Sequence, residues 1–317
     1  MNPGLYEQLL TRELQQNLDR LADPRLYSLD PVDAEESHAV IAQFLEHLLV
    51  SSLSTYRGVD AATNQKRLVD RIISTLTDEL GQDWSEQLSL ATPLRRLIAI
   101  HSKPVDSPTE RPDTPFTRSA VLTGTRELSL GSQIRKELVS ADRVDILCSF
   151  IKWSGLRVVM DALRELSERD PIGLPRIRVI TTSYMGATDP RAIEELSKLS
   201  NTEIRVSYDT QRTRLHAKAY IFHRQTGFGS AYVGSANLSH AALSEGLEWT
   251  TKISHYELPY LWNKITGTFD TYWGDDEFQI FDGNAPERLR SAIQSEQGTG
   301  IAGSAGPGPA TDGCRTP

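Results

Sequence analysis

Long apolar runs are missing from this sequence of 317 residues. A membrane-spanning helix needs about 20 consecutive apolar residues, and no stretch approaches that length. The opening residues, MNPGLYEQLLTRELQQ, have neither the basic region nor the apolar core of a secretory signal. We therefore expect a soluble protein of the cytoplasm with no membrane partner.

Cysteine is equally scarce, since the chain has only Cys148 and Cys314. Two cysteines exclude both a disulfide framework and a zinc site made of four thiolates. The motif G-x-x-x-x-G-K-[ST], which cradles the phosphates of ATP, is also absent. We therefore expect no ATP site of that type in this chain, which on its own is not a helicase.

Positive charge is in deficit, with a formal net charge of −8. This value argues against a uniformly basic surface, but the acidity is concentrated in residues 1–100, which carry 9 basic and 15 acidic side chains. Residues 205–224 have one acidic residue, Asp209, against five basic ones, which are Arg205, Arg212, Arg214, Lys218 and Arg224. We expect this segment to face an anion.

Apolar residues recur at spacings of three and four throughout residues 1–100, which predicts an all-α N-terminal region with a small core. A helix is also expected after Thr92-Pro93, because proline suits the first helical position. Residues 101–118 contain four prolines and almost no apolar residue, which is typical of a linker.

Strands and helices alternate between residues 119 and 275, which predicts a β-sheet flanked by helices. We expect strands at 120–122, 144–150, 177–182, 203–206, 215–222, 231–234 and 247–253, and helices at 132–140, 155–166, 190–199 and 258–269. Residues 276–317 form a C-terminal extension. We expect this extension to be disordered from about residue 298, because nine of its last twenty residues are Gly or Pro.

Three segments of this region carry polar residues suited to one site. Period-two alternation in the strand at 215–222 places His216 and Lys218 on one face. Sixteen residues after Lys218, the sequence Gly234-Ser235-Ala236-Asn237 leads from a strand into a turn, where glycine allows the backbone to approach a ligand closely. Glu248, on the next strand, offers a carboxylate to the same surface.

The pair of motifs H-x-K and G-S-x-N resembles the signature of the phospholipase D superfamily. The runs R-L-H-A-K-A-Y-I-F-H-R, Y-V-G-S-A-N-L-S-H-A-A-L and G-L-E-W look like the phospholipase D-like domain found N-terminal to some bacterial superfamily 2 helicases. The resemblance covers about residues 119–275. It implies the α/β phospholipase D-like fold, with a mixed β-sheet between helices, and a phosphodiester substrate. One departure is His223, where the longer signature has aspartate.

The resemblance also implies metal-independent chemistry without a cofactor, in which His216 attacks phosphorus and becomes a phosphohistidine. Glu248, with Glu245 as the alternative, would hold the imidazole in its reactive tautomer, while Lys218 and Asn237 would stabilise the transition state. In the superfamily, the histidine of a second motif protonates the leaving oxygen. This chain has one convincing copy of the motif, so the resemblance implies a homodimer in which both His216 side chains face one phosphate. Candidate substrate-binding residues are Ser235, Gly234, Arg214 and Arg212, followed by Tyr184 and Asp189.

Each of these residues also has a plainer interpretation. His216 would be a hydrogen-bonded core histidine, Asn237 a cap for a helix near Ser239, and Glu248 the ion-pair partner of Lys252 or an arginine. Most tryptophans are expected to pack in the core, with the option that one stacks on a base at the rim of the site. These tryptophans are Trp153, Trp249, Trp262 and Trp273.

The resemblance implies a nuclease that acts on nucleic acid, DNA more than RNA, in a restriction or phage-defence system with a helicase partner. The alternative is a non-catalytic nucleic-acid-binding or dimerisation module of a helicase assembly. A hydrogen bond between Glu248 and His216, with two His216 side chains converging across a dyad, would favour catalysis.

Overall fold

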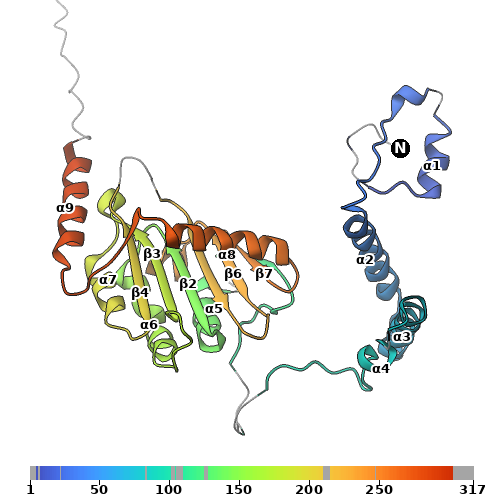
Figure 1. The fold of residues 1–317 in the computed structure, drawn as a ribbon, viewed down its shortest axis with the longest axis horizontal. Coiled ribbons are helices and arrows are strands. Elements are labelled where there is room, and N and C mark those ends of the chain that lie inside the picture. Colours follow the sequence, from blue (N-terminus) through green and yellow to red (C-terminus); the bar gives the residue numbers. More distant parts are fainter. Residues whose placement is uncertain are drawn as a thin grey trace, which may run out of the picture. The chain divides into compact units, whose positions relative to one another are not determined.

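The structure is a computed structural model that describes residues 5, 8–21, 23–82, 84–100, 104, 110–124, 128–209, 215–246 and 248–302. The chain divides into two units, Met1–Ser102 and Lys103–Pro317. Each unit is described by itself (Figure 1).

The first unit is helical. Its helices are α1 (Arg12–Leu18), α2 (Ser37–Thr55), α3 (Ala61–Leu80) and α4 (Trp84–Leu88), with a 3₁₀ turn at Pro24–Leu26. The Thr11 side chain caps α1 by accepting a hydrogen bond from the Leu14 amide at 3.2 Å. Gly81 ends α3 in the left-handed conformation, with φ at 64°.

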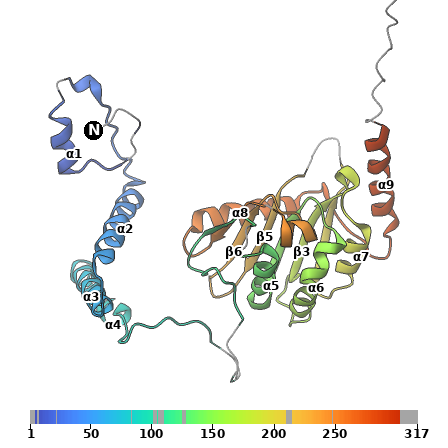
Figure 2. The ribbon, with the colours of Figure 1, turned by 180° about the vertical axis from the view of Figure 1, so that it is seen from behind.

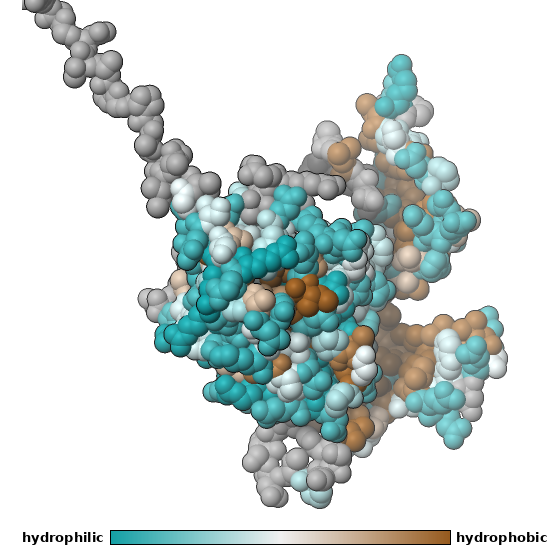
Figure 3. Space-filling view, turned by 60° about the vertical axis from the view of Figure 1, so that its left-hand side comes forward, coloured by the Kyte–Doolittle hydropathy of each residue, from teal (hydrophilic) through white to brown (hydrophobic). Residues whose placement is uncertain are grey.

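Two expectations for this unit were wrong. Leu18 is the only buried hydrophobic side chain among its described residues, so these helices enclose no core. Figure 3 shows the resulting hydrophobic surface over this unit. Residues 91–100 form no helix. The apolar residues expected to hold that helix are exposed, with Leu97 at 76%, and a short helix needs packing to persist.

The second unit is built on one mixed sheet of eight strands, in the order β1-β7-β6-β5-β2-β3-β4-β8. The strands are β1 (Ala120–Leu122), β2 (Arg143–Cys148), β3 (Ile177–Thr182), β4 (Thr202–Ser207), β5 (Lys218–His223), β6 (Ser230–Gly234), β7 (Thr250–Ser254) and β8 (Phe278–Ile280). Strands β2, β3 and β4 run parallel, and the other pairs are antiparallel. The predicted α/β fold with a mixed sheet is confirmed.

Helices cover both faces of this sheet (Figures 1 and 2). Helices α5 (Leu130–Ser140), α6 (Trp153–Ser167) and α7 (Pro190–Ser197) pack on one face, and α8 (Pro259–Gly274) packs on the other. Strand β5 serves both cores, because Tyr220 and Phe222 point to one side whereas Ala219 and Ile221 point to the other. This division follows the period-two alternation that the sequence predicts.

The C-terminal part continues further than the sequence indicated. Strand β8 pairs with β4, and helix α9 (Glu287–Ala302) buries Leu289 and Ile293 in the core of the α5 side. Helix α9 passes residue 298, where we expected order to end. Residues 303–317 lie outside the described part of the chain.

The expected linker also differs, because the later part of residues 101–118 packs within the second unit. Lys136 donates to Asp113 at 2.8 Å, and the buried Lys252 donates to the backbone and side-chain oxygens of Thr114 at 3.1 and 2.9 Å. The hydroxyl of Ser254 donates to the Phe116 carbonyl at 2.5 Å. These contacts hold the segment that precedes β1 in place.

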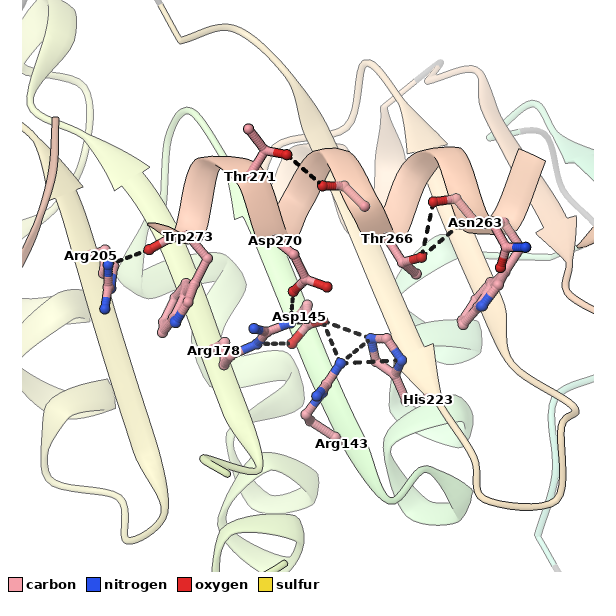
Figure 4. A network of polar contacts seen from close by, with 12 residues as sticks. Arg143, Asp145, Arg178, Arg205, His223, Asn263, Thr266, Asp270, Thr271 and Trp273 are labelled. Carbon is pink, nitrogen blue, oxygen red and sulfur yellow. Dashed lines mark hydrogen bonds and ion pairs between the residues drawn. The ribbon is translucent and has the colours of Figure 1, made fainter. Parts of the chain in front are cut away.

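A charged network lies between the sheet and α8 (Figure 4). Asp145 accepts two hydrogen bonds from Arg178, each at 2.7 Å, and contacts His223 at 2.6 Å and Arg143 at 3.2 Å. Arg178 also pairs with Asp270 at 2.8 Å. Burial raises the pKa of Asp145, but the hydrogen bonds from Arg178 and His223 hold this pKa below its ordinary value. His223 therefore has a structural role here.

Candidate active site

The polar motifs meet at one edge of the sheet. Strands β5, β6 and β7 are antiparallel neighbours, so the start of β5 at Lys218, the end of β6 at Gly234 and the start of β7 at Thr250 lie together. The end of β2 joins them, because Cys148 is the cross-strand partner of Lys218. His216 and Glu248 immediately precede β5 and β7, so both lie at the same edge.

His216 is exposed at this edge. Its imidazole makes an edge-on contact with the Phe150 ring, with 6.4 Å between the ring centroids. An exposed ring does not fit the interpretation of His216 as a buried core histidine. The imidazole is instead accessible to a ligand.

Lys218 follows His216 by two residues and is only 4% exposed. Its ammonium donates to the His216 carbonyl oxygen at 2.6 Å and lies 6.0 Å from the centroid of the Phe150 ring. Burial lowers the pKa of Lys218, while the negative charge of Glu248 acts in the opposite direction. A buried ammonium is costly without an anionic partner, so this site is suited to receive an anion.

Asn237 is fixed through its side-chain carbonyl. Its Oδ1 accepts a hydrogen bond from the Phe150 amide at 3.2 Å, which leaves the Nδ2 hydrogens to donate. The helical turn that follows is capped by Ser239, whose hydroxyl accepts from the Ala242 amide at 3.3 Å. The interpretation of Asn237 as the side-chain cap of that turn was therefore wrong.

Glu248 is held by the second motif. The Ser235 hydroxyl donates to Glu248 Oε2. Within the described residues, no hydrogen bond joins Glu248 to His216 and no ion pair joins it to Lys252. Only the backbone of Glu245 is described, in the π-helical turn Ala241–Glu245.

Gly234 permits a close approach, but of a neighbouring strand. A Cβ atom at this position would collide with the Trp249 carbonyl oxygen and lie 2.8 Å from the Thr250 Cα. The expectation that Gly234 admits a ligand is therefore replaced by tight packing of β7 against β6.

The basic segment at 205–224 does not form one anion-facing surface. Arg205 contacts Glu203 at 2.9 Å and donates to the Trp273 carbonyl, and Arg224 pairs with the buried Glu137 at 2.5 Å. Both arginines are therefore already neutralised away from the site. Arg212 and Arg214 lie outside the described residues.

The side chain of Asp189 is likewise used within the fold. It caps α7 by accepting from the Arg191 amide at 3.0 Å, and it accepts from the Trp153 amide at 3.3 Å. These contacts assign Asp189 a structural role in place of the substrate contact considered from the sequence. Tyr184 begins the 3₁₀ turn Tyr184–Gly186, next to α7.

Three residues that support the site were not singled out from the sequence. Phe150 lies against His216 and Lys218 and binds Asn237 through its amide. The Cys148 thiol accepts from the Leu238 amide at 3.2 Å, and the Tyr220 hydroxyl donates to the Ala236 carbonyl at 3.0 Å. Burial raises the pKa of Cys148, which keeps it a neutral thiol. The sequence held a signal for Tyr220, because period-two alternation places it on the same face of the strand as His216 and Lys218.

A row of exposed apolar side chains adjoins the site on the α8 side of the sheet. Val121 and Val233 both pair with Thr251 across strands, so all three share this face. Val121 is 57% exposed and Val233 is 36% exposed, and Trp249, which precedes β7, is 70% exposed. The expectation that Trp249 packs in the core was wrong.

Within the described residues, no group of three or more His, Cys, Asp or Glu side chains is arranged to hold a metal ion. None of the helices in that part of the chain is both long and apolar enough to cross a membrane.

Comparisons with known proteins give one family match. Residues 129–255 match the family described as the NgoFVII restriction endonuclease N-terminal PLD domain. Similar solved structures include NucT from Helicobacter pylori, which is 16% identical with a TM-score of 0.40, over 52% of this chain and 99% of that chain. Nuc from Salmonella typhimurium, a phospholipase D family member, is 18% identical with a TM-score of 0.39, over the same two shares. None of the curated proteins matches.

Proposed function

We propose that the chain is a metal-independent phosphodiesterase that cleaves nucleic acid, in keeping with the match of residues 129–255 to a phospholipase D-like domain family. The observation that carries the proposal is the pairing of an exposed His216 with a buried Lys218, both in contact with the Phe150 ring. This arrangement presents a nucleophile beside a cation that lacks a strong anionic partner.

The reaction proceeds through His216. Its neutral imidazole attacks phosphorus, a nitrogen–phosphorus bond forms, and the phosphorus–oxygen bond to the leaving nucleoside breaks. Lys218 and the Nδ2 hydrogens of Asn237 stabilise the charge on the remaining phosphoryl oxygens. Water then attacks the phosphohistidine, the nitrogen–phosphorus bond breaks, and His216 is released as a neutral base.

A second histidine must protonate the leaving oxygen and later accept a proton from the attacking water. We assign this role to His216 of the partner subunit in a homodimer, because the sequence contains one convincing motif. The exposed row of Val121, Val233 and Trp249 supports this assignment, because an apolar surface beside the site suits an interface with a second copy.

Glu248 is proposed as the positioning residue for His216. An ionised carboxylate has about four lone-pair sites, and the Ser235 hydroxyl uses one of those on Oε2. Oε1 is therefore able to accept the imidazole hydrogen when substrate draws His216 inward. Ser235 in this account holds the carboxylate at the edge of the site.

The substrate class is proposed from the family match. The matched family is described as the domain of a restriction endonuclease, which favours DNA over RNA and a restriction or phage-defence setting.

A protein partner is proposed from the first unit, which exposes apolar side chains along α2, including Ile41, Phe44 and Leu48. This surface suits a protein partner, which we propose is a helicase subunit of such a system.

A second candidate function is a non-catalytic nucleic-acid-binding or dimerisation module of the same assembly. One specific observation favours it, namely that Glu248 is hydrogen-bonded to Ser235 and not to His216. Such a module would bind phosphate at Lys218 without forming a covalent intermediate.

The test is cleavage of single-stranded DNA, double-stranded DNA and RNA in the presence of EDTA. We expect the intact protein to cleave at least one of them, the His216→Ala variant to be inactive, and the His223→Ala variant to retain activity. His223 is the matched control because it lies at the other end of β5, in the structural network. Equal nucleic-acid binding by all three proteins without cleavage would favour the second candidate.

A further inference from the structure

A cavity of about 120 Å³ adjoins the proposed active site on the α5 side of the sheet. It lies where the end of β1, the start of α5, the π-helical turn and the start of β7 come together. Its lining includes the apolar Leu122, Leu130 and Leu243 and the polar Glu248 and Thr250. Glu248 therefore faces both the cavity and, through Ser235, the catalytic edge.

The cavity is built by the backbone at two glycines. Gly124 has φ at +66°, and a Cβ atom there would collide with the Gly246 carbonyl oxygen. The segment before Gly246 is the π-helical turn Ala241–Glu245, which contributes Ala242 and Leu243 to the wall. Turns of this type are rare and are often found at functional sites.

The strongest sign of a ligand is a hydroxyl without a partner. Thr250 lines the cavity and is only 2% exposed, and its Oγ1 has no hydrogen-bond partner within the protein. Leaving a buried hydroxyl unpaired destabilises a protein. A bound group that hydrogen-bonds to Thr250 would remove this penalty.

The charge of the lining restricts the ligand. Ser129 and Leu130, at the start of α5, also line the cavity, and the start of a helix attracts anions. The Glu248 carboxylate lies in the same wall, however, and it would repel a phosphate. A neutral group fits both features if it donates a hydrogen bond to Glu248 and accepts one from Thr250.

The size and apolar walls restrict the ligand further. An engineered protein cavity of about 150 Å³ binds benzene, so a cavity of this scale holds one six-membered ring and not the fused rings of a purine. Leucine side chains on several sides suit the faces of such a ring. A pyrimidine base combines one ring with N–H donors and a carbonyl acceptor.

We infer that this cavity is a subsite for the pyrimidine base of the nucleotide next to the cleaved phosphate. This inference rests on the proposed nuclease function. The base donates an N–H to Glu248 and accepts from the Thr250 hydroxyl, while its phosphate lies at His216 and Lys218. The Ser235–Glu248 hydrogen bond couples the two parts of the site.

Two variants alter the cavity without touching the proposed catalytic residues. Thr250→Val keeps the shape of the side chain and removes the hydroxyl. Ala242→Leu adds volume at a residue that lines the cavity and is itself 8% exposed. Thr202→Val is the matched control, because Thr202 is a strand threonine at the start of β4, at the end of the sheet opposite to Lys218. Thermal unfolding is used to check that each variant is folded.

Cleavage is measured on oligonucleotides that differ only in the nucleotide beside the cleaved phosphate: a pyrimidine, a purine or an abasic residue. We expect the intact protein and Thr202→Val to prefer the pyrimidine. We expect Thr250→Val to reduce that preference roughly threefold to tenfold, the range for one net hydrogen bond, and Ala242→Leu to abolish it. Equal rates on all three substrates, or an unchanged preference in both folded cavity variants, would overturn the inference.

A second readout separates this inference from the proposed function. Hydrolysis of bis(p-nitrophenyl) phosphate requires His216 but no base, so it reports the chemistry alone. If this hydrolysis occurs without any base preference, only the pyrimidine subsite is refuted. If it does not occur, calorimetry with cytidine and uridine monophosphates against ribose 5-phosphate still tests the cavity, and equal affinities in intact protein and Thr250→Val would refute it.

Discussion

Strand β5 joins two polar clusters that differ in how their charges are compensated. At its end, His223 belongs to a network in which Asp145 contacts two arginines and a histidine. At its start, Lys218 is buried with a backbone carbonyl as its hydrogen-bond acceptor, and His216 is exposed beside it. One cluster is complete within the protein, and the other is suited to an external anion.

This difference explains the departure of His223 from the superfamily signature. The position that carries aspartate in the longer signature is here occupied by a histidine that binds an aspartate from β2. The network retains a carboxylate, but on a different strand. His223, five positions after Lys218, therefore contributes to folding, while His216, two positions before it, is the residue for which we propose a role in the chemistry.

The largest expected effect comes from breaking the complete cluster. Asp145→Ala leaves Arg178 buried without its principal partner, and we expect a loss of about 3–5 kcal/mol in the free energy of unfolding. Urea denaturation measures this loss. Asp270→Ala is the control, since Asp270 is 58% exposed, and a similar loss there would refute the central role of Asp145.

The next prediction concerns Lys252, which is another buried cation. Burial lowers the pKa of Lys252 from 10.5 to about 8. Between these two values the unfolded chain binds more protons than the folded one, so the free energy of unfolding should rise with pH. Relative to Lys252→Met, we expect the intact protein to gain about 3 kcal/mol from pH 8 to 10.5. Parallel pH profiles of the two proteins would contradict this lowered pKa.

Glu248→Gln alters the open cluster while the fold is kept. If Glu248 positions the imidazole, kcat should fall by about 100-fold, with little change in KM or in the unfolding midpoint. Glu248→Asp should restore part of the activity, and the acidic limb of the pH profile should shift in the glutamine variant. A change confined to stability would show that Glu248 is only structural.

The smallest effect is expected from His223→Asp, which restores the residue of the signature. A second carboxylate would then face Asp145, and we expect a loss of about 1–2 kcal/mol in the free energy of unfolding. Activity should stay within a factor of about two. Enhanced cleavage by this variant would mean that the two ends of β5 are coupled in the reaction.

Much of the second unit was predictable because its strands and helices carry their own periodicity. The alternation in β5 correctly divided its residues between the two cores. Composition predicts a linker at residues 113–116, but the structure holds these residues in place. The contacts that hold them come from far along the chain, such as the ammonium of Lys252 at 2.9 Å from the Thr114 hydroxyl. The local composition of residues 101–118 cannot predict a contact with a residue so far along the chain.

The site shows the same limit. The spacing of the two motifs placed them on adjacent strands, but it did not reveal the role of Phe150. The Phe150 amide fixes Asn237, and its ring contacts both His216 and Lys218. The sequence pattern predicts that Gly234 approaches a ligand. The approach is instead by β7, which the strand order shows and the motif does not. Strand neighbours, and not motif spacing, determine these contacts.

The central claim is that His216 becomes covalently bound to phosphorus, and a trapping experiment tests it most directly. A labelled oligonucleotide is mixed with the protein in EDTA, the reaction is stopped in alkaline denaturant, and the labelled peptide is identified by mass spectrometry. We predict an acid-labile phosphoryl adduct on His216 that His223→Ala still forms. Cleavage without any adduct, or an adduct on another residue, would contradict the account.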